Sequence, residues 1–207
     1  MAKENDIEAL YDGVQKESKK LEQACLQYHS NGFQTYVVAK MLNDKNSIHV
    51  SVLPTGSGKG WIAVLLSRML SAKGDSNAIV TSDTYLVEQL EDMLGQCKHD
   101  FTILNMQQAI SRHDEFQCFI IDEADECITH RGVLVDEGKE KVLGFWDVMM
   151  KRSYLLTATV ENYMQDILYK LFNLKQDQFA KYRVVMSSVA KGCCLSSTNY
   201  YVGNTET

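Results

Sequence analysis

The ten residues from Ser51 to Gly60 constrain this chain more than any other stretch. They read Ser-Val-Leu-Pro-Thr-Gly-Ser-Gly-Lys-Gly, and they lie between a run of β-branched and aliphatic residues and an apolar helical run. Glycines let backbone N–H groups face an anion with no Cβ in the way. The start of the helix adds a partial positive charge, and Lys59 adds a full one. A strand, a glycine-rich turn, a lysine and a helix together predict a cradle for phosphate groups.

The predicted cradle departs from the usual phosphate-loop pattern at both ends. That pattern begins with glycine or alanine and has serine or threonine after the lysine, whereas this chain has Leu53 and Gly60 there. The missing hydroxyl is the group that ligates Mg²⁺. Because Mg²⁺ usually keeps several waters, a further water can take its place, and we expect hydrolysis to be slowed more than nucleotide binding. The predicted nucleotide-binding residues of the loop are Thr55, Gly56, Ser57, Gly58, Lys59 and Gly60.

An acidic run that begins at Asp122 is the second feature with chemical meaning. It follows residues 116–121, an almost wholly apolar segment typical of a central strand in a parallel sheet. Carboxylates at the carboxyl end of such a strand lie where an α/β sheet places its chemistry. We predict that Asp122 holds Mg²⁺ and that Glu123 orients the attacking water. The alternative is that these carboxylates only form an acidic helix N-terminus, which the helix dipole favours. We prefer this alternative for Glu126.

Strand-like and helix-like segments alternate along most of the chain, which is typical of a doubly wound, mainly parallel α/β sheet. Upstream, apolar residues at helical spacing from Ile7 to Tyr28 predict one or two amphipathic helices that end near Asn31-Gly32. We expect an N-terminal helical extension over 1–31, one nucleotide-binding domain over 32–187, and a tail or linker over 188–207. Strands are predicted over 48–53, 77–82, 101–104, 116–121, 153–156 and 182–186, and helices over 33–42, 61–70, 84–94, 106–110, 141–150 and 163–172.

Composition narrows the class of protein. The 207 residues, 45% hydrophobic and 23% charged, are ordinary for a single soluble globular domain. A net charge of −6 argues against a nucleic-acid coat protein but allows a motor that grips nucleic acid locally. The six cysteines lack metal-ligand spacing, so we expect no zinc site. We expect no membrane span and no targeting segment, which favours a cytoplasmic or nuclear location.

The order of these motifs resembles that of the superfamily-2 helicases and translocases, which include the DEAD-box proteins. The match is to their first RecA-like domain and covers about residues 33–186. Pro-Thr-Gly-Ser-Gly-Lys at 54–59 is similar to motif I, Asp-Glu-Ala-Asp at 122–125 to motif II, and Thr-Ala-Thr at 157–159 to motif III. Val-Thr-Ser at 80–82, with Leu86 and Gln89, is similar to motif Ia. Each motif is short, but four of them in the right order, each after a predicted strand, are specific.

The resemblance implies roles for residues outside the phosphate cradle. Phe33-Gln34 is similar to the upstream glutamine that reads adenine, because an amide both donates and accepts hydrogen bonds. A surface glutamine that caps a helix is the alternative. Motif Ia implies that Thr81, Ser82 and Gln89 contact the nucleic-acid backbone. The groups that would couple the nucleotide site to strand movement are Asp125, Thr157 and Thr159.

The function that the resemblance implies is that of an ATP-binding helicase-type motor domain, which uses Mg²⁺ and contacts single-stranded nucleic acid. Its catalytic residues would be Lys59, Asp122 and Glu123. We find no counterpart of the family's second RecA-like domain, whose arginine finger can be worth about 10³–10⁵-fold in turnover. We therefore expect weak ATPase activity, and a second RecA-like domain or a partner protein for full activity. Two alternatives stay open: a degenerate domain that serves as a structural component of an assembly, and a fragment of a preprotein-translocase motor, which shares this core.

Overall fold

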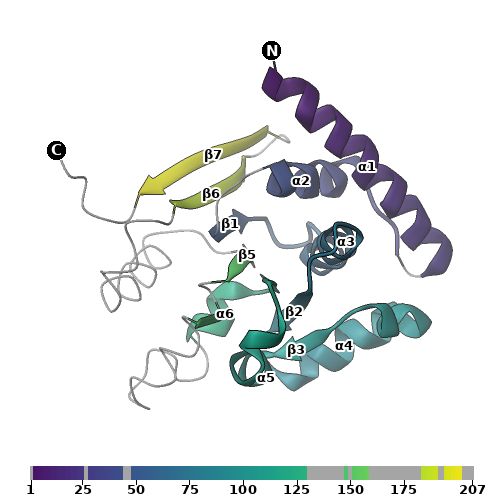
Figure 1. Cartoon of the computed structure of the whole chain (residues 1–207), viewed down its shortest axis with the longest axis vertical. Helices are drawn as coiled ribbons and strands as arrows, with labels where there is room; N and C mark the ends of the chain where they lie inside the picture. The colour runs from purple at the N-terminus through teal and green to yellow at the C-terminus, as the bar shows by residue number, and fades with distance from the viewer. Residues whose placement is uncertain are drawn as a thin grey trace.

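A computed structural model describes residues 2–25, 28–43, 48–129, 147–148, 151–158, 183–190 and 194–201. These residues form a seven-stranded sheet in the order β3-β2-β4-β5-β1-β6-β7, with helices packed against it (Figure 1). The strands are β1 Ile48–Val52, β2 Asn77–Thr81, β3 Ile103–Asn105, β4 Cys118–Ile121, β5 Arg152–Thr157, β6 Arg183–Ala190 and β7 Cys194–Tyr201. The helices are α1 Ala2–Ala24, α2 Gly32–Asn43, α3 Lys59–Ala72, α4 Thr84–Leu94, α5 Met106–Ser111 and α6 Ala124–Thr129, with 3-10 turns η1 Gly95–Asp100 and η2 His113–Glu115.

The sheet is mainly parallel, as the alternation of segments predicted. All neighbouring pairs from β3 to β6 run parallel, and β7 pairs antiparallel with β6. Every residue of β1, β2 and β4 is buried. Strands of a parallel sheet are covered on both faces, which explains their nearly continuous runs of aliphatic residues. The predicted α/β fold class is therefore confirmed.

Three neighbouring strands bring the predicted motifs to one edge of the sheet. Strand β5 lies between β4 and β1 and pairs with both in parallel register. The carboxyl ends of these three strands therefore meet at the same edge. The glycine-rich loop follows β1, the acidic run follows β4, and Thr157 ends β5.

The N-terminal segment packs onto the same core as the sheet. Helix α1 contacts both α2 and α3 (Figure 1). Val14 and Leu21 of α1 belong to one hydrophobic cluster with residues of α3 and the central strands. The Tyr28 ring meets Trp61 of α3 edge to face, with ring centroids 4.9 Å apart. The predicted extension is thus helical as far as Ala24.

The prediction that an N-terminal helix ends near Asn31-Gly32 is wrong. Helix α1 ends at Ala24, and Asn31 marks the beginning of α2 instead. The Asn31 Oδ1 accepts from the Gln34 backbone N–H at 2.9 Å, and the Asn31 N–H donates to Gln34 Oε1 at 3.2 Å. This reciprocal pair is a capping box. Asn-Gly is compatible with either helix end, and the glutamine three residues after Asn31 was the signal for an N-terminus.

The segment predicted as a tail or linker contains a strand. Strand β6 extends to Ala190, and β7 pairs with it from Cys194 to Tyr201. Threonine and tyrosine favour strands when a partner strand is present, but the Ser/Asn-rich sequence around them indicates loop. The helices predicted over 141–150 and 163–172 lie outside the described residues, apart from 147–148. No helix within the described ranges has the length and apolarity needed to cross a membrane.

Candidate nucleotide-binding site

The glycine-rich loop connects β1 directly to the first residue of α3. Gly56 and Gly58 have φ angles of 80° and 77°, in the left-handed region that glycine adopts without steric cost. The Ser57 N–H donates to the Pro54 carbonyl at 3.1 Å, which closes the turn. Because α3 begins at Lys59, the free N–H groups of its first turn lie next to this loop. The order of strand, turn, lysine and helix is the one predicted.

Gln34 lies against the loop. Its Nε2 donates to the Ser57 carbonyl at 3.1 Å, and its side chain is 5% exposed. A Cβ on Gly58 would collide with this Nε2 and displace the Gln34 amide, and the φ of 77° would strain any residue other than glycine there. The Gln34 carboxamide thus caps α2 at one end and holds the loop at the other. The capping role raised as an alternative is present, but Gln34 is buried and not a surface residue. The contact with adenine stays a prediction.

Lys59 and Glu123 form an ion pair across the site. The Lys59 Nζ lies 3.1 Å from Glu123 Oε1, and the lysine side chain is 8% exposed. Glu123 has a φ of 46° and is the one non-glycine residue with positive φ in the described part of the chain. A left-handed conformation costs a non-glycine residue about 1–2 kcal/mol. The turn between β4 and α6 therefore holds the Glu123 backbone in an unfavourable conformation beside the loop lysine.

Asp122 lies against the residue that replaces the usual hydroxyl. A Cβ built on Gly60 would be 3.7 Å from Asp122 Oδ2, an ordinary van der Waals contact. Burial of the carboxyl, followed by the negative charge of Glu123, raises the pKa of Asp122 to about 6. Its Oδ1 accepts from the Glu123 N–H at 3.1 Å. The acidic run and the phosphate loop, far apart in sequence, thus meet at one place.

Thr157 connects the ends of the three strands. Its hydroxyl donates to Asp125 Oδ1 at 2.7 Å, and its carbonyl accepts from the Leu53 N–H at 2.8 Å. One buried threonine therefore touches both the acidic run and the start of the phosphate loop. This position fits the coupling role that the resemblance implies for Asp125 and Thr157. Thr159, the other predicted coupling residue, lies outside the described residues.

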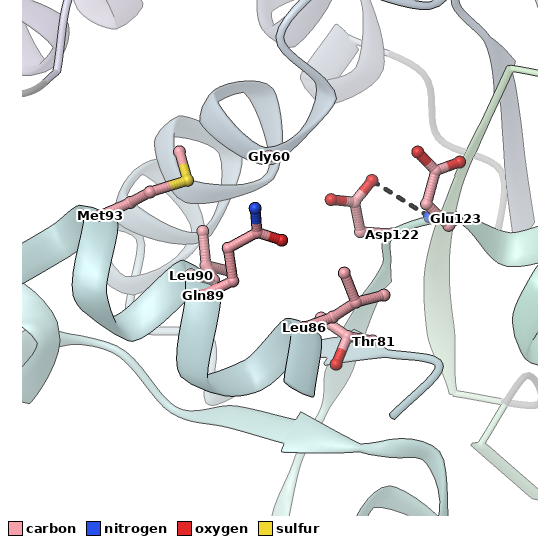
Figure 2. A pocket seen from close by; sticks show the side chains of 8 residues that line it. All are labelled: Gly60, Thr81, Leu86, Gln89, Leu90, Met93, Asp122 and Glu123. Carbon is pink, nitrogen blue, oxygen red and sulfur yellow. Dashed lines mark hydrogen bonds between the residues drawn. The ribbon is translucent and has the colours of Figure 1, made fainter. Parts of the chain in front are cut away.

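A cavity of about 170 Å³ opens beside Gly60 and Asp122 (Figure 2). Two of the residues predicted to contact nucleic acid, Thr81 and Gln89, line it. The third, Ser82, is buried and donates to Glu126 Oε2 at 3.4 Å. Sequence reasoning missed the apolar wall, which is the inward side of α4. The full lining is Gly60, Thr81, Leu86, Gln89, Leu90, Met93, Asp122 and Glu123.

The fold is shared with solved helicase structures. The UvsW helicase from bacteriophage T4 is 14% identical, with a TM-score of 0.51 over 75% of this chain and 58% of that chain. A hypothetical ATP-dependent RNA helicase from Sulfolobus tokodaii is 18% identical, with a TM-score of 0.52 over 81% of this chain and 56% of that chain. This chain has a helicase-like RecA fold. At these identities the likeness concerns the fold alone.

The helicase-like chain spans somewhat more than half the length of each of these two structures. No protein-family model matches its sequence. No curated protein matches it either.

Proposed function

We propose that this chain is an ATP·Mg²⁺-binding helicase-type module that hydrolyses ATP weakly on its own and contacts single-stranded nucleic acid. The observation that carries the proposal is the meeting of a glycine turn, Lys59, Asp122 and Glu123 at the ends of neighbouring parallel strands. In open α/β sheets, ligands bind beyond the carboxyl ends of the strands. A lysine next to a helix N-terminus and two carboxylates match the chemistry of a triphosphate with its cation.

The loop has free groups for phosphate oxygens. The Ser57 hydroxyl is buried and has no hydrogen-bond partner among the described residues. A buried polar group without a partner costs about 1–3 kcal/mol, so a ligand oxygen at this point is favourable. Lys59 would exchange its pairing with Glu123 for the β- and γ-phosphates. That exchange releases the Glu123 carboxylate to orient the attacking water.

Asp122 is the residue that would hold Mg²⁺. Bound Mg²⁺ would neutralise charge on the phosphate oxygens as the bond to the leaving group breaks. No group of three or more His, Cys, Asp or Glu side chains in the described part of the chain is arranged to hold a metal alone. Asp122 would therefore share the cation with phosphate oxygens and water. Gly60 has no side-chain oxygen to offer the cation. This absence supports the proposal that the missing hydroxyl slows hydrolysis more than it weakens nucleotide binding.

Nucleic-acid contact and coupling form the second half of the proposal. The Thr81 hydroxyl donates to the Asp83 carbonyl at 3.0 Å, and the Ser82 hydroxyl is held by Glu126. Nucleic acid would therefore meet backbone groups at this edge of the sheet more readily than these hydroxyls. Movement there would reach the phosphate loop through Thr157, Asp125 and Leu53. A second RecA-like domain or a partner protein would complete the motor.

The alternative is a degenerate module that serves as a structural component of an assembly. Two observations favour it: Gly60 lacks the metal ligand, and Lys59 is already neutralised by Glu123. Titration with ATP and Mg²⁺ during thermal unfolding separates the two functions. A ligand at about 100 times its dissociation constant adds about 2.7 kcal/mol of stability, which is several degrees for a chain of this size. Unchanged melting with ATP or ADP, with or without Mg²⁺, would favour the alternative.

Nucleic-acid binding needs a separate measurement. We expect a single-stranded oligonucleotide to bind, with an affinity that falls as salt is added, because phosphate contacts release counterions. Binding should also change when ATP·Mg²⁺ is present, if the Thr157 connection couples the two sites. Salt-independent binding, or none, would contradict this half of the proposal while leaving nucleotide binding intact.

Replacing Gly60 with threonine should raise ATP turnover by about 10-fold, with a smaller change in ATP affinity. A Cβ at this position has ordinary contacts, 3.7 Å from Asp122 Oδ2 and 3.9 Å from Leu90 Cδ1, so the first atom of the new side chain fits. Steady-state phosphate release measures the gain. Gly60→Ala is the matched control, since it adds the Cβ without the hydroxyl. Equal turnover of the threonine and alanine variants would contradict the role given to the missing hydroxyl.

A further inference from the structure

The cavity beside Gly60 lies next to the position where the usual phosphate loop has a serine or threonine side chain. Gly60 forms one wall of it, and Asp122, the proposed Mg²⁺ ligand, forms another. Much of the remaining wall is apolar, from Leu86, Leu90 and Met93 of α4. Any polar group that reaches this space from α4 is therefore next to the incomplete side of the proposed metal site.

Gln89 is such a group. Figure 2 shows its carboxamide projecting from α4 into the cavity, on the side that faces Gly60 and Asp122. No hydrogen bond joins the Gln89 side chain to any described residue, whereas the Thr81 hydroxyl in the same cavity already donates to the Asp83 carbonyl. Gln89 is also solvent-accessible, so water enters the cavity with it. Its amide is thus available to a ligand.

An amide oxygen has the chemistry that the site lacks. Mg²⁺ and Ca²⁺ take oxygen ligands, and Mg²⁺ keeps several of its waters. The carboxamide can turn about its last torsion to present either its oxygen or its nitrogen, since that torsion is broad. It can therefore bind the cation or accept from a water that the cation holds.

We propose that Gln89 supplies, directly or through one water, an oxygen that replaces only in part the one Gly60 lacks around the Mg²⁺ of a bound nucleotide, holding the cation without restoring full turnover. The inference rests on the proposed function of the site. It gives Gln89 a metal-positioning role in place of the nucleic-acid contact implied by the resemblance. Helix α4 would then contribute to the nucleotide site as well as α3 and the turn after β4.

The test compares nucleotide affinity with and without the cation. The dissociation constant of a non-hydrolysable ATP analogue is measured by calorimetry in Mg²⁺ and again in EDTA. Gln89→Met keeps the length of the side chain and removes its oxygen. We expect it to weaken binding about 10-fold in Mg²⁺ and to leave binding in EDTA unchanged, since loss of an outer-shell partner of a metal costs 10–100-fold. Gln107→Met, the same change on exposed α5, is the matched control and should bind as the wild type does.

A rescue experiment separates a metal role from packing. In Gln89→Met, the further change Gly60→Thr should restore most of the affinity in Mg²⁺, because a hydroxyl then returns to the shell. Equal losses in Mg²⁺ and in EDTA would overturn the inference, as would a Gln89→Met variant that binds the analogue normally but loses affinity for single-stranded RNA. A wild-type protein that binds no nucleotide in either condition would overturn the proposed function itself, and this inference with it.

Discussion

Replacing Lys59 with methionine will remove the thermal stabilisation that we expect ATP and Mg²⁺ to give the wild-type protein. The lysine supplies the full positive charge of the loop, and the exchange keeps its apolar stem packed. It also leaves the Glu123 carboxylate, 3.1 Å from the lost ammonium, facing the phosphates without a counter-charge. We expect the dissociation constant for ATP to rise about 100-fold, which is about 2.7 kcal/mol. Calorimetric titration at constant Mg²⁺ measures the change.

The control for this variant lies on the same helix. Lys73 is exposed at the other end of α3, where it caps the helix away from the loop. Lys73→Ala should bind ATP as the wild type does. Melting of both variants without ligand shows whether each is folded before the titration. If folded Lys59→Met bound ATP to within about twofold of the wild type, the loop would not be a triphosphate site.

Replacing Asp122 with asparagine will stabilise the ligand-free protein against unfolding. The same change will remove the stabilisation that Mg²⁺ adds in the presence of ATP. The folded protein raises the pKa of this carboxyl from 3.8 to about 6, mainly through burial. A raised acid pKa means that the ionised form destabilises the fold, so the cost is full above about pH 6 and disappears below the unfolded value. Asp122→Asn removes that cost, which is on the order of 3 kcal/mol at neutral pH. The same change removes the proposed metal ligand.

Thermal melting at several pH values checks both halves of this prediction. Without ligand, Asp122→Asn should melt several degrees above the wild type at neutral pH. The difference should shrink as the pH falls through 6, because the wild-type carboxyl then takes up its proton. With ATP, added Mg²⁺ should stabilise the wild type and not the variant. Asp92→Asn, an exposed change on α4, should alter neither. A variant less stable than the wild type at neutral pH would contradict the assigned burial cost.

The parts of the site that could be predicted from sequence depend on local geometry or on one topological rule. The turn at Gly56 and Gly58 follows from what glycine allows at positive φ. The meeting of Gly60 with Asp122 follows from the rule that parallel strands end at the same edge of a sheet. Thr157 reaches Asp125 for the same reason, since β5 ends between the other two strands.

The parts that could not be predicted depend on contacts between distant segments. Nothing local to Lys59 indicates that Glu123 neutralises it, because that pair forms only after β4 is placed beside β5. The cavity at Gln89 depends on how α4 lies against α3, which periodicity does not give. Strand β7 needs β6 beside it before its polar sequence becomes a strand. The misplaced helix end at Asn31 has a different cause, a cap residue used at both kinds of helix terminus.

The packing of α1 has a practical consequence for work on this protein. By sequence, Gly32 is an attractive place to trim the chain down to the part predicted to bind nucleotide. Trimming there would strip Val14, Leu21 and Tyr28 from the outer surface of α3, the helix whose first residue is Lys59. A shortened protein would expose an apolar strip on that helix and would aggregate in solution. Poor behaviour of such a fragment would then say nothing about its affinity for ligands.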